Sequence, residues 1–361
     1  MIKIDKFFLS KKEGINMGRS NIGRFFRVLV PVMLLVCWWA APSLAAEKLR
    51  IGALRLTSSA PLFIALEKGY FADEGLDVEL KFMKSAQPVA MALASGDVDV
   101  GATGLTAGLY NAAANGLKVS IVADKGRVWP GYKLVGLMVS NDAWEKGVRT
   151  LGDLKGKRVG ITQVGSTFHY MLGNILTKNG MDLKDVKPTP LGGVKSMMDA
   201  VAANRIETAF MVQPFCSVME KKKMGHVMLW AGNEMRYQIA AIFISEKLSK
   251  NEDLSLKFLR SYIRACRFYY DNCLTKKEGL LVKGPGFDEV IGYIAKYTSR
   301  KPSLIALGLN YNDRNGKLFA DDIQRQIDWY HGHKMVGKRL DAQKLVNMEL
   351  WRKALESLDR K

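Results

Sequence analysis

The sequence predicts a two-lobed α/β protein in which each lobe is a mostly parallel β-sheet flanked by helices. A pattern of strand, helix, strand, helix, strand over residues 50–100 recurs over residues 158–208, and such alternation is typical of parallel sheets with right-handed crossovers. From residue 254 onward, apolar residues recur at helical spacing instead. The chain has 361 residues, of which 48% are hydrophobic and 25% charged. These values indicate a globular protein of two domains and exclude a disordered or fibrous chain.

The two copies of the repeat agree at three places along the chain. In each copy a strand begins with three residues: Arg, then Ile or Val, then Gly. A hydroxyl-rich turn then leads into a helix, and Gly, an apolar residue and Asp follow at the end of that helix. These places are residues 50–52, 57–59 and 75–77 in the first copy and residues 158–160, 165–167 and 180–182 in the second. A helix end and a short strand follow in both, at residues 94–100 and 202–208. The repeat therefore predicts two lobes of similar build.

The remaining elements assign the last third of the chain to the first lobe. An apolar strand is expected over residues 238–244, and helices over residues 256–270, 320–331 and 345–358. These helices need an apolar surface, and the first lobe otherwise has only residues 47–131. We therefore expect a discontinuous first lobe, residues 46–131 plus 246–361, and a second lobe of residues 132–245.

Residues 1–45 have the features of a cleavable signal peptide. Arg24 and Arg27 precede an apolar run over residues 28–41, and small residues follow at positions 42–45. The run is too short to span a bilayer, for which about 20 apolar residues are needed. The mature protein is therefore expected in the periplasm. Starting at Met17 would give a leader of more typical length, so both start positions remain open.

The charge of the chain favours anionic partners. The formal net charge is +19, from 54 basic and 35 acidic residues. Residues 1–45 hold seven basic and two acidic residues, so the rest of the chain carries 54 − 7 − (35 − 2) = +14. Charge alone does not choose among anionic partners, but no nucleic-acid-binding signature is present, and no nucleic-acid partner is expected.

Candidate ligand-binding residues follow the strands of the repeat. In open α/β sheets, ligands bind at the carboxyl ends of the strands, where helices begin and present free backbone N–H groups. Four such ends can be read from the sequence, and their hydroxyl groups suit a small oxyanion or a polar head group. They contribute Thr57, Ser58 and Ser59; Thr103, Gly104 and Thr106; Ser166 and Thr167; and Gln213 and Phe215. The alternative is that Ser and Thr before helices only cap them, and this alternative stays open for each residue.

Three further candidates lie beside these loops. His169 follows the second-lobe turn and is either a ligand donor or an ordinary helix residue. Arg127 and Trp129 lie between a strand and the expected crossing, where a guanidinium would neutralise an anion and an indole would stack on a ring. Their alternatives are a solvated charge and a side chain packed in the hinge.

The sequence does not predict catalytic residues, a metal site or a cofactor. None of the four histidines has the context of a triad or a metal cluster, and the turn at Ser166 is not a nucleophile elbow. The carboxylates of Asp97, Asp99 and Glu207 are expected to form structural pairs. Cys216, Cys266 and Cys273 have neither disulfide nor zinc spacing, and we expect them to be buried.

The segments 61–71, 74–78 and 153–160 resemble the periplasmic binding proteins for nitrate, sulfonates and taurine. The wider family also includes binding proteins and synthases for thiamine pyrimidines. The resemblance covers most of residues 48–300, whereas the tail after Tyr297 matches only loosely. It implies a type II periplasmic binding protein fold with hinges near residues 129–131 and 245–246.

The resemblance also implies a function. The protein would be the solute-binding component of an ABC importer: a monomer that closes two lobes on a ligand and delivers it to a membrane permease driven by a cytoplasmic ATPase. A sulfonate, nitrate or carboxylate is the expected ligand, although the aromatic residues near the site would also suit a ring. The alternatives are a pyrimidine synthase-like enzyme on the same fold and a sensor that presents its ligand to a membrane receptor.

Overall fold

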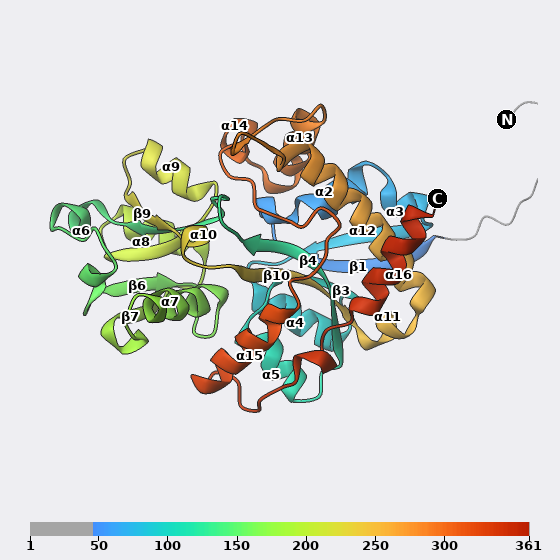
Figure 1. Cartoon of the computed structure of the whole chain (residues 1–361), viewed down its shortest axis with the longest axis horizontal. Coiled ribbons are helices and arrows are strands. Elements are labelled where there is room, and N and C mark those ends of the chain that lie inside the picture. Colours follow the sequence, from blue (N-terminus) through green and yellow to red (C-terminus); the bar gives the residue numbers. More distant parts are fainter. Residues whose placement is uncertain (1–45, 361) are drawn as a thin grey trace, which may run out of the picture. The chain divides into compact units, whose positions relative to one another are not determined.

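A computed structural model describes residues 46–360 of the protein. The described residues form one compact unit, which contains two five-stranded sheets (Figure 1). The expected signal peptide, residues 1–45, lies outside the described residues. No helix within residues 46–360 combines the length and the apolar character needed to cross a membrane.

The first sheet has the strand order β2-β1-β3-β10-β4. β1 runs parallel to β2 and β3, whereas β10 runs antiparallel to β3 and β4. The strands are β1 (Glu47–Ala53), β2 (Leu76–Phe82), β3 (Val100–Gly104), β4 (Val119–Val128) and β10 (Tyr237–Ser245). The helices between them are η1 (Thr57–Ser59), α2 (Ala60–Glu67), α3 (Tyr70–Asp73), α4 (Ala86–Ser95) and α5 (Ala107–Ala114).

The second sheet repeats this arrangement in the order β7-β6-β8-β5-β9. β6 runs parallel to β7 and β8, and β5 runs antiparallel to β8 and β9. The strands are β5 (Val135–Val139), β6 (Arg158–Ile161), β7 (Lys187–Pro190), β8 (Thr208–Val212) and β9 (His226–Trp230). The helices are α6 (Asn141–Glu145), η2 (Gly152–Leu154), α7 (Thr167–Lys178), η3 (Leu183–Asp185), α8 (Val194–Ala202), α9 (Phe215–Lys221) and α10 (Ala231–Glu234). The two lobes predicted from the repeat are therefore confirmed.

One ion pair occurs at equivalent positions in both lobes. The backbone N–H and guanidinium of Arg50, in β1, donate to the Asp99 carboxylate just before β3. Arg158, in β6, binds Glu207 just before β8 in the same way. Asp99 and Glu207 thus join the first and third strands of each repeat, which is the structural pairing expected for them.

The chain crosses between the sheets twice, and the second crossing differs from the expected one. The first crossing joins β4 to β5 over residues 129–134, which includes the expected hinge. The return was expected near residues 245–246, but β10 pairs with β3 and β4 and so belongs to the first sheet. The crossing therefore precedes β10, at residues 235–236. An apolar run reveals a buried strand, but it does not show which sheet the strand joins.

The tail is mainly helical and packs on more than the first lobe. α12 contacts α2 and α16 in the first lobe, as expected, but α15 contacts both α5 of the first lobe and α7 of the second. The elements of the tail, gold to red in Figure 1, are α11 (Glu246–Lys250), α12 (Glu252–Cys273), β11 (Lys276–Lys277), β12 (Leu280–Leu281), α13 (Phe287–Thr298), α14 (Pro302–Ile305), α15 (Asp321–Gly332), η4 (Ala342–Lys344) and α16 (Met348–Asp359).

Candidate functional site

The loop after β1 forms the first part of the candidate site. Thr57 and Ser59 are buried, and the Ser59 hydroxyl donates to the Leu54 carbonyl at 2.9 Å. Ser58 is half-buried, and its hydroxyl and carbonyl oxygens both accept hydrogen bonds from Lys125 Nζ, at 3.1 and 3.2 Å. Of the three residues expected here, Ser58 is the one whose side chain meets a cation.

Thr106 and Ser166 cap helices. The Thr106 hydroxyl accepts a hydrogen bond from the backbone N–H of Leu109 at the start of α5, at 3.4 Å. Ser166 does the same for His169 at the start of α7, at 3.3 Å. Both side chains are almost fully buried. Each hydroxyl therefore already satisfies a backbone donor of its own helix.

The lobes touch each other at these helix starts. The backbone N–H of Ala107 donates to the Gly165 carbonyl at 2.9 Å, so the first N–H of α5 points to the other lobe. A Cβ on Gly104 would lie 2.9 Å from Cγ2 of Thr167, which places these two candidates in contact. Thr103, in β3, is 1% exposed and its hydroxyl has no hydrogen-bond partner within the described residues.

His169 is held inside the second lobe. Its Nδ1 accepts a hydrogen bond from the backbone N–H of Gly165 at 3.2 Å, and its ring meets Trp329 edge-on. Burial, with a smaller contribution from His333, lowers the pKa of His169 to about 4. The imidazole is therefore neutral at physiological pH and contributes no charge to an anion site.

Gln213 and Phe215 lie where β8 ends, and the tail reaches both. The Gln213 amide donates to the Ser217 hydroxyl at 2.9 Å. A Cβ on Gly308 would lie 2.1 Å from Cβ of Gln213, so the tail backbone passes directly over this residue. The Arg300 guanidinium lies 4.3 Å from the centre of the Phe215 ring.

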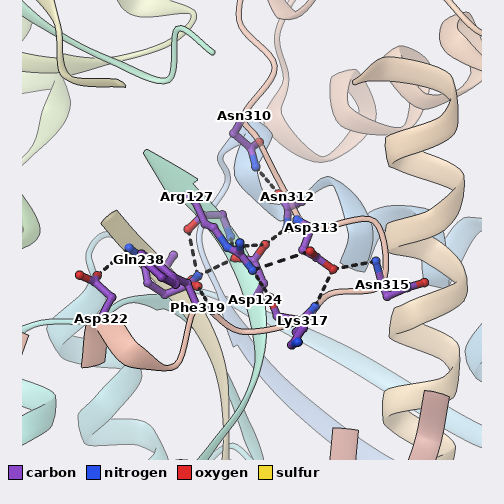
Figure 2. Close-up of polar contacts among 12 residues, drawn as sticks. Asp124, Arg127, Gln238, Asn310, Asn312, Asp313, Asn315, Lys317, Phe319 and Asp322 are labelled. Atoms are coloured by element: carbon purple, nitrogen blue, oxygen red, sulfur yellow. Dashed lines mark hydrogen bonds and ion pairs between the residues drawn. The ribbon is translucent and has the colours of Figure 1, made fainter. Parts of the chain in front are cut away.

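Arg127 belongs to a buried polar network that ties β4 and β10 to the tail (Figure 2). Its Nε lies 3.6 Å from Asp124 Oδ2, and its Nη2 donates to the carbonyl of Lys317. Asp124 is fully buried and accepts hydrogen bonds from Gly126 N, Asp313 N and the Gln238 amide. The charge of Arg127 is thus matched by an internal carboxylate.

Trp129 packs against the same part of the tail. Its ring stacks on Tyr311 with centroids 5.4 Å apart and meets Phe319 edge-on. The structure therefore brings Arg127 and Trp129 to the tail segment and gives each of them partners there.

Lys125 is a residue of the site that the sequence reasoning missed. It lies in β4, is 1% exposed, and forms no ion pair within residues 46–360. Burial lowers its pKa to about 7, against the opposing effect of Asp124. A sequence signal was available, because Asp124 and Lys125 are consecutive charged residues in a strand that begins with mainly apolar residues.

The open surface hollows do not mark this site. A hollow of about 600 Å³ lies between α5 and Ser245, and a second of about 460 Å³ lies beside η2 and Gly180. Neither is lined by a residue of the strand-end loops described above. We locate the site from the contacts of its residues, because ligands of this fold bind at the strand ends.

Known proteins resemble the chain in both sequence and fold. The family model described as NMT1/THI5 like matches residues 56–273, more than half of the chain. YtlA of Bacillus subtilis, described as a binding protein, is 27% identical over 213 residues, which are 57% of this chain and 61% of YtlA. The chain spans about half the length of four related Brucella proteins, also described as binding proteins. A B. subtilis protein described as an aliphatic sulfonates-binding protein is 22% identical over 341 residues, 91% of this chain and 96% of that protein.

Solved structures extend the similarity over most of the chain. The alkanesulfonate-binding protein SsuA from Xanthomonas axonopodis pv. citri, bound to MOPS, aligns with a TM-score of 0.67 at 19% identity, covering 84% of this chain and 99% of SsuA. The periplasmic nitrate-binding protein NrtA from Synechocystis PCC 6803 aligns with a TM-score of 0.68 at 17% identity, covering 88% and 90%. The chain belongs to the NMT1/THI5-like family and has the two-lobed fold of the periplasmic binding proteins.

Proposed function

We propose that this protein is the extracytoplasmic solute-binding component of an ABC importer. It is exported to the periplasm by the signal peptide at residues 1–45, captures a small anion between its lobes, and delivers it to a membrane permease. It carries out no chemical reaction on the ligand, and a cytoplasmic ATPase drives import.

The burial of Lys125 is the observation that supports an anionic ligand. Its ammonium group is buried beside Ser58, at the carboxyl ends of the first-lobe strands. A buried charge is costly unless an opposite charge compensates it, and Ser58 supplies only neutral oxygen atoms. An anion bound next to Ser58 would provide this compensation and would gain charge-assisted hydrogen bonds.

The site also explains why lobe closure would depend on the ligand. Lys125 and Ser58 belong to the first lobe, whereas Thr167 and Gln213 belong to the second, and the lobes already meet at Gly104 and Thr167. A ligand that contacts residues of both lobes stabilises the closed form by its differential affinity for that form. The permease would then recognise the closed protein.

Two relatives support the choice of ligand class. One is described as binding aliphatic sulfonates, and another is described as binding nitrate; both ligands are small anions. YtlA and the Brucella relatives are also described as binding proteins, which favours binding over catalysis.

The test is a binding experiment with a matched pair of lysine variants. Native mass spectrometry would first reveal any ligand that copurifies with the protein. Calorimetry would then use ethanesulfonate, nitrate, benzoate and a neutral aminopyrimidine. K125M should weaken binding of the preferred anion by about tenfold or more, because a hydrogen bond to a charged group is worth about 1.5–3 kcal/mol.

K184M is the control, because Lys184 is exposed in η3 and forms no ion pair within the described residues. It removes the same charge without touching the site, so its affinity should equal that of the wild type. The proposal fails if no anion binds, or if K125M folds normally by circular dichroism and binds as tightly as K184M.

A further inference from the structure

A segment of the tail forms one side of the candidate site. Between α13 and α15 the chain passes over the end of β8, where Gly308 lies against Gln213 and Arg300 lies against Phe215. This segment follows the part of the chain that the family model matches, residues 56–273. It therefore brings residues to the site from outside the region that defines the family.

Arg300 is a second cation at the site without an acidic partner. It is half-buried and forms no ion pair with a carboxylate within residues 46–360. Desolvation lowers its pKa, and its guanidinium rests on the face of Phe215. Arg127 differs, because Asp124 lies 3.6 Å away and neutralises it.

Contacts within the first lobe link Arg300 to the loop that holds Lys125. Arg55 Nη1, two residues before Thr57, donates to the carbonyl of Tyr297 at 2.8 Å. The end of α13 thus lies against the loop after β1, and Arg300 follows three residues later. Lys125 binds the same loop at Ser58. Both cations are therefore linked to the loop after β1, Lys125 directly and Arg300 through the end of α13.

We propose that Arg300 determines ligand specificity and that the ligand carries two anionic groups, one bound at Lys125 and Ser58 and the other at Arg300. The inference rests on the proposed function and names its ligand class. Each of the two cations has lost part of its hydration. A dianion compensates both charges, whereas a monoanion leaves one of them unpaired.

The test compares anions that differ by one charge at similar size. Ethanesulfonate and sulfoacetate form one pair, and butyrate and succinate form the other. In the pair that the wild type binds more tightly, the dianion should bind at least about tenfold more tightly than the monoanion. R300Q should reduce this preference by about tenfold, because it loses more affinity for the dianion than for the monoanion. R205Q, which removes an exposed arginine from the second lobe, should keep the full preference.

A second variant displaces the segment without changing a charge. In G308V the new side chain would overlap that of Gln213, which forces the tail away from the end of β8 and should also reduce the preference. G337A is its control, because a Cβ at Gly337 meets no atom within 4 Å. Thermal unfolding of each variant verifies that the protein is folded.

The outcomes separate this inference from the proposed function. If R300Q and G308V keep the wild-type preference while K125M weakens both anions, Arg300 has no role in specificity and the solute-binding function stands. If the wild type prefers the monoanions, the inference is likewise overturned. If no anion of either pair binds, the proposed function fails, and the inference fails with it.

Discussion

Raising the pH should weaken anion binding through the deprotonation of Lys125. Burial lowers the pKa of this lysine to about 7, with Asp124 opposing the shift. Only the protonated form can bind an anion by a charge-assisted hydrogen bond. Above pH 7 the ligand-free protein must therefore take up a proton before or while it binds.

The size of the effect follows from this pKa. For each pH unit above the pKa of the free protein, the protonated fraction falls about tenfold, and the dissociation constant rises by the same factor. Between pH 7 and pH 9 the protonated fraction falls from about one half to about 1%, which is a loss of about 50-fold, or about 2.3 kcal/mol of binding free energy. This tenfold rise of the dissociation constant per pH unit continues as long as Lys125 stays protonated in the complex, that is, while its pKa in the complex is higher than the pH.

Calorimetry with ethanesulfonate at several pH values measures this slope, since the sulfonate stays ionised throughout. Buffers of different ionisation enthalpy would report the proton taken up on binding. In K125R the guanidinium stays charged over the whole range, so its affinity should be nearly independent of pH. A flat profile in the wild type, or an equal slope in K125R, would refute the role given to Lys125.

The same lysine should change the stability of the ligand-free protein in the opposite direction. In the unfolded chain Lys125 has its ordinary pKa of 10.5, and in the folded protein a pKa of about 7. Between these values the unfolded state binds more protons, so this group makes the free energy of unfolding rise with pH. K125M lacks this contribution. Urea unfolding of the wild type and K125M at pH 7 and pH 9 measures the difference.

Three further predictions concern caps, the buried network and the thiols. T106A and S166A should each lower the free energy of unfolding by about 1 kcal/mol, as expected for lost caps; a large loss of ligand affinity at normal stability would instead show that the hydroxyl binds ligand. D124A should cost about 3–5 kcal/mol in urea unfolding, because it removes the nearer carboxylate of Arg127 and the acceptor of three hydrogen bonds, and leaves only Asp313, 3.9 Å from Arg127. A loss below about 1 kcal/mol would contradict the network in Figure 2. The three buried thiols should react with a thiol reagent at pH 8 only after unfolding, because burial raises the pKa of each; they belong to Cys216, Cys266 and Cys273.

The sequence was more informative about local structure than about the pairing of distant segments. The repeat predicted both lobes, and apolar spacing predicted the helices now seen as α12, α15 and α16. The strand at residues 238–244 was also predicted, but its place in the first sheet was not. Periodicity reports how a segment buries one face, whereas sheet membership depends on partners more than 100 residues away.

The candidate site, too, could be predicted from the sequence only in part. Residue type and position before a helix identified Thr106 and Ser166, and the structure shows both hydroxyls capping their helices. Lys125 escaped notice because its importance comes from burial beside Ser58, a residue 67 positions earlier.

The sequence by itself determined the two repeated lobes and the basic charge, because each depends on local pattern or composition; the leader segment and the ligand-binding strand ends stay predictions. Only the tertiary structure decided that Arg127 pairs with Asp124, that Lys125 and Arg300 have no such carboxylate within the described residues, and that the tail reaches the end of β8. Whether a charge is compensated depends on which side chains folding brings within a few ångströms, and no local pattern contains that information.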